Sequence, residues 1–337
     1  MLKRLQEKNT QIIAAYICMF AVLSLSLLFN LIPTIIAGLL AFVLSKDFLE
    51  KLKVKLPNNT FQEKLVGLIV GFGSLGALSL IVLAISKTLS GENISDLINT
   101  IAQTLTNSKQ FLPPQIADYI PDSINEIKQK FILAFKEHVS SFADFGKGAL
   151  HSLFIILVGW LIGILVACKK IKKEHTPFSK TWFELWLKLS DAFRFVVFAQ
   201  VKVALFNSIC MAIFLFVVSP LLGWDIPYSK ILVLITFICG LIPIVGNLIS
   251  NTITFIVSMT VSLPAAIAAL VMLIVIHKLE YFIISKSLGA DIDSGVWEIL
   301  IVLFSFEILF GLSGMVFSPI IYVFFKQELR RINWLQK

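Results

Sequence analysis

The sequence predicts an all-α, polytopic integral membrane protein with about eight membrane segments and a small extracytoplasmic helical domain. The first observation behind this prediction is composition: 57% of the residues are hydrophobic, 15% are charged, and the mean hydropathy is +0.88. Soluble proteins carry about 25% charged residues, so a chain this apolar needs lipid around much of its surface. The other observations are long apolar stretches and the clusters of Lys and Arg between them.

Apolar stretches recur along the whole chain. A helix needs about 20 residues to cross the hydrocarbon core of a bilayer. The stretch 31–45 is shorter than this, so we expect it to form a hairpin with 11–29 around Asn30–Pro33, whereas 230–276 is too long for one span and must turn. The first stretch follows a basic N-terminus and lacks an Ala-x-Ala cleavage site, which predicts an uncleaved first span. The full set is 11–29, 31–45, 65–86, 148–168, 201–222, 230–276 and 297–325.

The basic residues predict the orientation of these spans. Lys and Arg are retained on the cytoplasmic side of membrane proteins. With a cytoplasmic N-terminus and alternating spans, every basic cluster falls on the cytoplasmic side, and so do both termini. The clusters comprise Lys3, Arg4 and Lys8; Lys46, Lys51, Lys53, Lys55 and Lys64; Lys169, Lys170, Lys172, Lys173 and Lys180; and Arg330, Arg331 and Lys337.

This topology divides the chain into four parts. Residues 1–86 contain three spans, and residues 87–147 form the extracytoplasmic domain, whose acidic and basic residues nearly balance. Residues 148–200 contain the fourth span, a basic loop and an interfacial helix over 181–200, for which the cytoplasmic end of a long span is the alternative. Residues 201–337 form a C-terminal membrane core with broken helices.

The extracytoplasmic domain carries an amphipathic pattern. Apolar residues recur there at helical spacing, and prolines interrupt the pattern in the middle. An apolar helix face needs a partner, which we expect to be a neighbouring subunit, the membrane surface or another such helix. The apolar residues of the first helix are Ile94, Leu97, Ile98, Ile101 and Leu105.

Gly and Pro interrupt two of the apolar stretches. The segment Gly240–Asn247 contains Pro243 and Gly246, and the segment Gly311–Gly314 interrupts 297–325. Pro removes a backbone donor, and Gly permits backbone angles that end a helix. Non-helical backbone at membrane depth persists only inside protein or beside a watery cavity, and paired interruptions of this kind indicate the binding site of a transporter. Ordinary kinks are the alternative for each.

Two arrangements of the broken stretches are compatible with the chain. In the first they are plain spans, which leaves Lys278 and Lys286 outside the cell. In the second, 230–262 and 297–325 are re-entrant hairpins, residues 263–276 cross the membrane, and both lysines become cytoplasmic. The tendency of basic residues to stay inside favours the hairpins.

Polar residues near the breaks are candidate binding groups. Glu307 lies inside an apolar stretch, where a carboxylate is costly and marks a proton or cation site unless it is paired or solvated. Asn247 and Asn251 are one helical turn apart, so they can coordinate a solute or bond a neighbouring helix. The candidates for solute or ion binding are Pro243, Gly246, Asn247, Asn251, Glu280, Glu307, Gly311 and Gly314.

The sequence contains no motif for catalysis, nucleotide binding or metal binding. The histidines are scattered, and the four cysteines lie in or beside apolar stretches without the spacing of metal ligands. The basic clusters lie between apolar stretches, which is a topological pattern rather than that of a nucleic-acid surface. We therefore expect no enzyme activity, no cofactor, no metal site and no nucleic-acid partner.

Several segments, in order, resemble the autoinducer-2 exporter-like permease family. The resemblance extends over most of the chain and includes both breaks. Its segments are Pro33 with Ala37–Leu44, Gln200–Phe214, Pro243-Ile-Val-Gly246, Glu280 with Ser285, and Gly311-Leu-Ser-Gly314 through Pro319.

The resemblance implies a secondary transporter in the bacterial inner membrane that exports a small polar solute or signal, such as a quorum-sensing furanone. It also implies an alternative within the same family, an Na⁺(Li⁺)/H⁺ antiporter, and a homo-oligomer, with pentamers described. Expected partners are therefore membrane lipid, a small solute or a cation and proton, and further copies of the chain. A membrane scaffold that transports nothing and a channel remain alternatives from other functional classes.

Overall fold

The computed structural model of the chain is all-helical in the residues that it describes, which confirms the all-α part of the predicted fold class. No strand occurs among the described residues. Most of the predicted extracytoplasmic domain, which is the part that follows its first amphipathic helix, lies outside the described residues. The described residues are 2–29, 31–53, 60–88, 91–108, 145–168, 176–242, 245–288 and 296–331.

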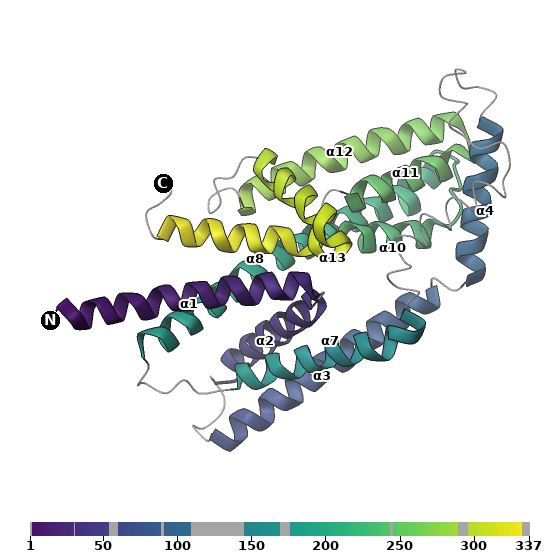
Figure 1. The fold of residues 1–337 in the computed structure, drawn as a ribbon. Coiled ribbons are helices and arrows are strands. Elements are labelled where there is room, and N and C mark those ends of the chain that lie inside the picture. The colour runs from purple at the N-terminus through teal and green to yellow at the C-terminus, as the bar shows by residue number, and fades with distance from the viewer. Residues whose placement is uncertain are drawn as a thin grey trace. The chain divides into compact units, whose positions relative to one another are not determined.

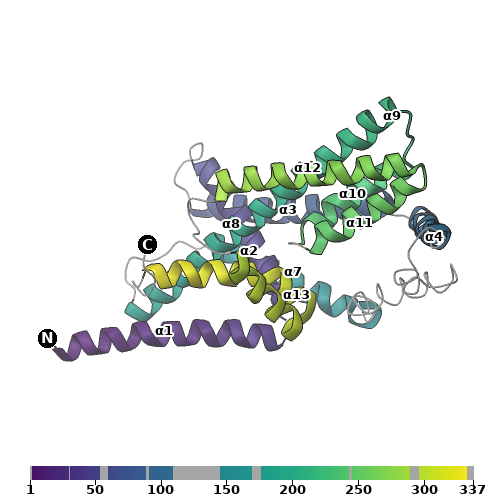
Figure 2. The ribbon, with the colours of Figure 1, turned by 90° about the horizontal axis from the view of Figure 1, so that it is seen from above.

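The described helices are shown in chain order in Figures 1 and 2. Residues 181–200 belong to α8 instead of forming a separate helix, and α8 continues through a π-helical turn, η2. The chain turns between α1 and α2 where the sequence predicts it, and Pro33 lies in the first turn of α2, where its missing N–H costs nothing. The elements are α1 (Leu2–Leu28), α2 (Ile32–Lys53), α3 (Thr60–Thr88), α4 (Gly91–Ser108), α7 (Phe145–Ala167), α8 (Pro177–Ile213), η2 (Phe214–Val218), α9 (Ser219–Leu221), α10 (Ser229–Gly240), α11 (Val245–Met259), α12 (Leu263–Leu288) and α13 (Val296–Arg331).

Among the described residues, three helical segments are long and apolar enough to cross a membrane: Asn9–Leu28, Ile32–Lys51 and Pro177–Leu221. Large apolar side chains such as Phe20 and Phe154 are exposed along these and other helices. Lipid, and not water, is the solvent in which such surfaces are stable, so the chain is a membrane protein. Shorter apolar helical segments are Gly67–Leu80, Leu153–Ala167, Ser229–Gly240 and Leu263–Leu279.

The chain forms two compact units. The first comprises Met1–Ser79, Phe145–Val197 and Ser294–Lys337, and the second comprises Leu80–Asp144 and Phe198–Asp293. Each unit is therefore built from segments that are far apart in the sequence.

Glycines allow α2 and α7 to pack closely in the first unit. A Cβ atom on Gly159 would lie 2.2 Å from the Thr34 carbonyl oxygen, and one on Gly163 would lie 2.1 Å from the Gly38 carbonyl oxygen. Small residues at such contacts are how membrane helices gain van der Waals packing. Trp160 of α7 also donates an indole hydrogen bond of 3.0 Å to the Gly71 carbonyl of α3.

The second unit packs α4 against the helices of the C-terminal part of the chain. In Figures 1 and 2, α10, α11 and α12 run side by side, and α4 lies across their ends. Leu97 and Ile101 of α4 are buried in a cluster with Ile226 and Val257, and the Thr100 and Tyr228 hydroxyl groups are 3.2 Å apart. The apolar face of α4 is thus covered by this chain's own core, a partner that the sequence pattern did not indicate.

Candidate functional site

The first predicted break separates two helices of the second unit. α10 ends at Gly240 and α11 begins at Val245, and the two helices pack against each other as a hairpin. A Cβ atom on Gly246 would lie 1.7 Å from the Cys239 carbonyl oxygen, so only glycine permits this approach. Gln200 of α8 donates a 2.6 Å hydrogen bond to the Gly240 carbonyl, which would otherwise lack a partner at the helix end.

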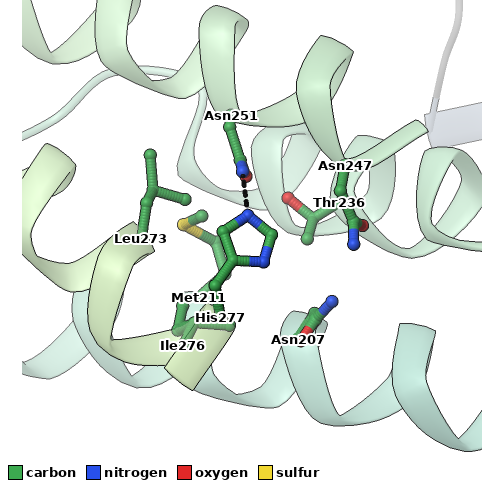
Figure 3. Close-up of a pocket in the computed structure, with 8 residues that line it drawn as sticks. All are labelled: Asn207, Met211, Thr236, Asn247, Asn251, Leu273, Ile276 and His277. Carbon is green, nitrogen blue, oxygen red and sulfur yellow. Dashed lines mark hydrogen bonds between the residues drawn. The ribbon is translucent and has the colours of Figure 1, made fainter. Parts of the chain in front are cut away.

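A polar pocket lies beside this hairpin, between four helices of the second unit (Figure 3). The space is about 230 Å³ including its open side, and its enclosed part has room for about one water molecule. α8 contributes Asn207 and Met211, α10 contributes Thr236, α11 contributes Asn247 and Asn251, and α12 contributes Leu273, Ile276 and His277.

The polar side chains of the pocket face one another. Asn251 Nδ2 donates a hydrogen bond of 2.9 Å to His277 Nε2, which joins α11 to α12 (Figure 3). The polar ends of Asn207, Thr236 and Asn247 lie around the same space, and Asn207 is only 4% exposed. The Thr236 hydroxyl donates to a carbonyl of its own helix, so it can still accept a hydrogen bond from a ligand.

This set of side chains suits an uncharged ligand with hydrogen-bond donors and acceptors. The lining contains amides, a hydroxyl group and an imidazole, and no Asp, Glu, Lys or Arg among the described residues. The lining offers no fixed opposite charge that would offset the cost of removing a charged ligand from water. Within the described part of the chain, no group of three His, Cys, Asp or Glu side chains is arranged to hold a metal ion.

The polar face of α11 continues beyond the pocket. Ser250, Thr254 and Ser258 are buried on this helix, and each hydroxyl group donates to a carbonyl of its own helix. Together with Asn247 and Asn251 they recur at three- and four-residue spacing, so they share one helix face. This three- and four-residue spacing of polar side chains is present in the sequence. It becomes visible only when the polar residues of the stretch are considered together and not one at a time.

The second predicted break folds α13 back on itself in the first unit. Glu298 and Lys326 are 28 residues apart, which in a continuous helix corresponds to about 42 Å. Their side chains nevertheless form an ion pair of 3.0 Å, and the Tyr322 hydroxyl also donates to Glu298. Gly311 makes the turn with φ 63° and ψ −154°, a conformation that is essentially restricted to glycine. Both predicted breaks are therefore helical hairpins.

Comparison with known families decides the class of the protein. The model of a family described as AI-2E family transporter matches residues 12–334. The chain belongs to the AI-2E transporter family. The match covers nearly the whole chain, including both hairpins and the pocket, and it confirms the resemblance drawn from the sequence. No curated protein matches the chain.

The predicted site residues of this AI-2E family transporter fall into three groups. Asn247 and Asn251 line the pocket, and Gly246 closes the hairpin beside it. Glu307, Gly311 and Gly314 belong to the first unit, where Glu307 is half-buried in the first arm of the α13 hairpin. Pro243 lies outside the described residues, and so does the side chain of Glu280, whose backbone is part of α12. Whether these residues bind solute stays a prediction.

A charged network that the sequence did not suggest joins three helices of the first unit. The Glu328 carboxylate is 5% exposed and accepts hydrogen bonds from Tyr16 of α1, Lys188 of α8 and Arg331 of α13. Burial by itself raises the pKa of Glu328, but these hydrogen bonds outweigh burial and hold the pKa below the ordinary value of a glutamate. Only Arg331, three residues further along the helix, is a partner that local spacing could predict.

Proposed function

We propose that this AI-2E family protein is a secondary transporter of the bacterial inner membrane that exports a small, neutral, polar solute, with both termini in the cytoplasm. The observation that carries the proposal is the uncharged polar pocket beside the α10–α11 hairpin. Transporters bind their substrates where helices are interrupted, because unwound backbone and nearby polar side chains replace the water around the solute. Three asparagines, a threonine and a histidine offer both donors and acceptors to such a solute.

The size of the pocket supports transport by moving helices and not by a permanent pore. Room for about one water molecule is too little for an organic solute, which ordinarily occupies a cavity of about 300 Å³ or more. The helices around the pocket must therefore separate to admit a solute and close again after release. We expect the transporter to be a homo-oligomer, as the family resemblance implies.

The test uses inverted inner-membrane vesicles or proteoliposomes with the quorum-sensing furanone as probe. We expect furanone flux that saturates with concentration and falls at least tenfold in Asn207→Leu and in Asn247→Leu. The matched control is Asn107→Leu, because Asn107 is exposed on α4 and does not line the pocket. Equal furanone flux in wild type and in protein-free liposomes would reject export of this solute.

A second candidate function is exchange of Na⁺ or Li⁺ for protons. The half-buried carboxylate of Glu307 favours it, because no other described residue forms an ion pair with this side chain. In proteoliposomes loaded with a pH-sensitive dye, antiport predicts a cation-dependent pH change that Glu307→Gln abolishes. If the wild type shows no cation-dependent pH change, antiport is excluded. The furanone assay is then the remaining test of transport.

A further inference from the structure

Among the described residues, His277 is the only ionisable side chain that lines the pocket. α11, which supplies its hydrogen-bond partner, contains no acidic or basic residue. The other described titratable side chains of this unit lie off the pocket lining: Lys87 on α3, Asp96 on α4, Lys202 and Cys210 on α8, Asp225 and Tyr228 before α10, Lys230 and Cys239 on α10, and Lys278 on α12. The same elements also carry Glu92, Glu280 and Lys286, whose side chains lie outside the described part of the chain.

The contact with Asn251 makes Nε2 the accepting nitrogen of the imidazole ring. An amide nitrogen can only donate, so at 2.9 Å from Asn251 Nδ2 the His277 Nε2 atom must be an acceptor without a proton. Protonation of Nε2 would place two donors opposite each other. The contact then breaks, or the Asn251 amide rotates so that its oxygen accepts from the ring. Either change alters the pattern of donors and acceptors that the pocket presents to a solute.

We propose that His277 is the proton-binding residue of this pocket and that proton uptake at His277 releases the bound solute. An imidazole can exist as a neutral ring or as a protonated ring, so His277 is the described lining residue that can take up a proton. One proton is bound as a new N–H bond at Nε2, which gives the ring a positive charge, and one neutral solute is released without any change in its own bonds. The linkage is reciprocal, because a solute that prefers the neutral ring must weaken proton binding by the same factor.

The proposal rests on the proposed function for the chemistry of the solute, but proton binding can be measured without transport. The full chain, labelled with ¹³C and ¹⁵N in histidine and held in detergent or lipid nanodiscs, is titrated by NMR. The chain has four histidines, and the signal of His277 is the one missing from His277→Gln. We expect this signal to change from that of a neutral ring to that of a protonated ring as the sample is acidified. A ring that keeps one protonation state throughout the acid titration overturns the proposal.

The variant Asn251→Asp tests the geometry with the histidine unchanged. A carboxylate opposite Nε2 would accept the new N–H, so we expect proton affinity at His277 to rise at least tenfold. Asn107→Asp adds the same charge on an exposed position of α4 and should leave the titration unchanged within twofold. Equal titrations of Asn251→Asp and Asn107→Asp would overturn the assignment of Asn251 as the partner that senses the proton.

The coupling to solute is tested by repeating the wild-type titration with the furanone present. We expect proton affinity at His277 to fall by about 5-fold or more, the lower range of measured coupling between sites. Furanone flux without this change would overturn the coupling and leave the proposed function intact. A changed titration without flux would support the coupling and reject transport of the furanone, so the two failures are distinguishable.

Discussion

The two helical hairpins of this AI-2E family transporter arise from the same kind of sequence signal but have different interiors. The α10–α11 hairpin is closed by Gly246 against the Cys239 carbonyl, and a neutral polar pocket lies beside it. The α13 hairpin turns at Gly311, packs Gly314 against the Phe306 carbonyl, and joins its two arms with a charged contact between Glu298 and Lys326.

From this difference we propose that a broken membrane helix is not by itself a binding site. In α13 the glycines permit a sharp turn, and Glu298 of the first arm pairs with Tyr322 and Lys326 of the second arm. Beside α10–α11 the amides of Asn207, Asn247 and Asn251 gather around open space with one histidine. We assign solute binding to this pocket and structural support to the α13 hairpin, and the variants below test that division.

The largest effect is expected at Gly246, where the pocket hairpin closes. Any side chain would collide with the Cys239 backbone, so Gly246→Val should prevent α10 and α11 from packing. We expect a loss of stability on the order of 4 kcal/mol or more, seen as little or no monodisperse protein after detergent extraction. Gly76→Val is the control, because a Cβ atom at Gly76 meets no other atom within 4 Å. Normal extraction of Gly246→Val would contradict the close approach.

A smaller effect is expected when the Glu328 network loses its centre. Glu328→Ala leaves Lys188 without the carboxylate that lies 2.7 Å away, and removal of one partner of a buried pair costs about 3 kcal/mol. Thermal unfolding in detergent measures the loss. Glu184→Ala removes an exposed carboxylate 4.0 Å from Lys180 and should change stability by less than about 0.5 kcal/mol. Equal effects of the two variants would show that the network contributes no more than a surface pair.

A substitution at Gly311 tests the turn of α13 without steric collision. A Cβ atom there meets nothing within 4 Å, so the cost comes from the backbone conformation alone. We expect Gly311→Ala to destabilise by about 1–3 kcal/mol. Gly73→Ala is the control at an open position inside a helix and should be neutral or stabilising by up to about 1 kcal/mol. A stabilising Gly311→Ala would mean that this glycine adopts an ordinary helical conformation.

The smallest effect is a pH dependence that arises from Glu328. Its pKa in the folded chain is below that in the unfolded chain, which is about 4.3. The stabilising contribution is therefore complete above about pH 4.3 and is lost as the pH falls through the folded value. Thermal unfolding of the wild type between pH 6 and 3 should show this loss, and Glu328→Gln should have a shallower slope. Identical slopes of stability against pH in the wild type and in Glu328→Gln would exclude Glu328 as the source of the pH dependence.

The positions of both breaks could be predicted because Gly and Pro act locally on the backbone. Gly311 turns α13 through its own positive φ, and Gly246 permits close approach to the Cys239 carbonyl of the preceding helix, so both effects act over a short stretch of chain. Asn247 and Asn251 could likewise be assigned to one helix face from their spacing alone.

Contacts between distant residues could not be predicted in this way. His277 joins Asn251 only because α12 packs on α11, and Glu328 joins Tyr16 across 312 residues of sequence. A single sequence contains no local pattern that encodes such pairs. For the same reason the apolar face of α4 indicated that a partner exists but not that α10 and α11 provide it.

The most direct test of the account compares one residue from each hairpin in the same flux assay. Asn247→Leu and Glu307→Gln are reconstituted at equal protein amounts, and furanone flux and cation-dependent pH change are recorded for both. The account predicts that Asn247→Leu loses at least nine-tenths of the furanone flux with unchanged thermal stability, whereas Glu307→Gln retains it. Loss of furanone flux in Glu307→Gln with normal flux in Asn247→Leu would contradict the account and assign solute binding to the α13 hairpin.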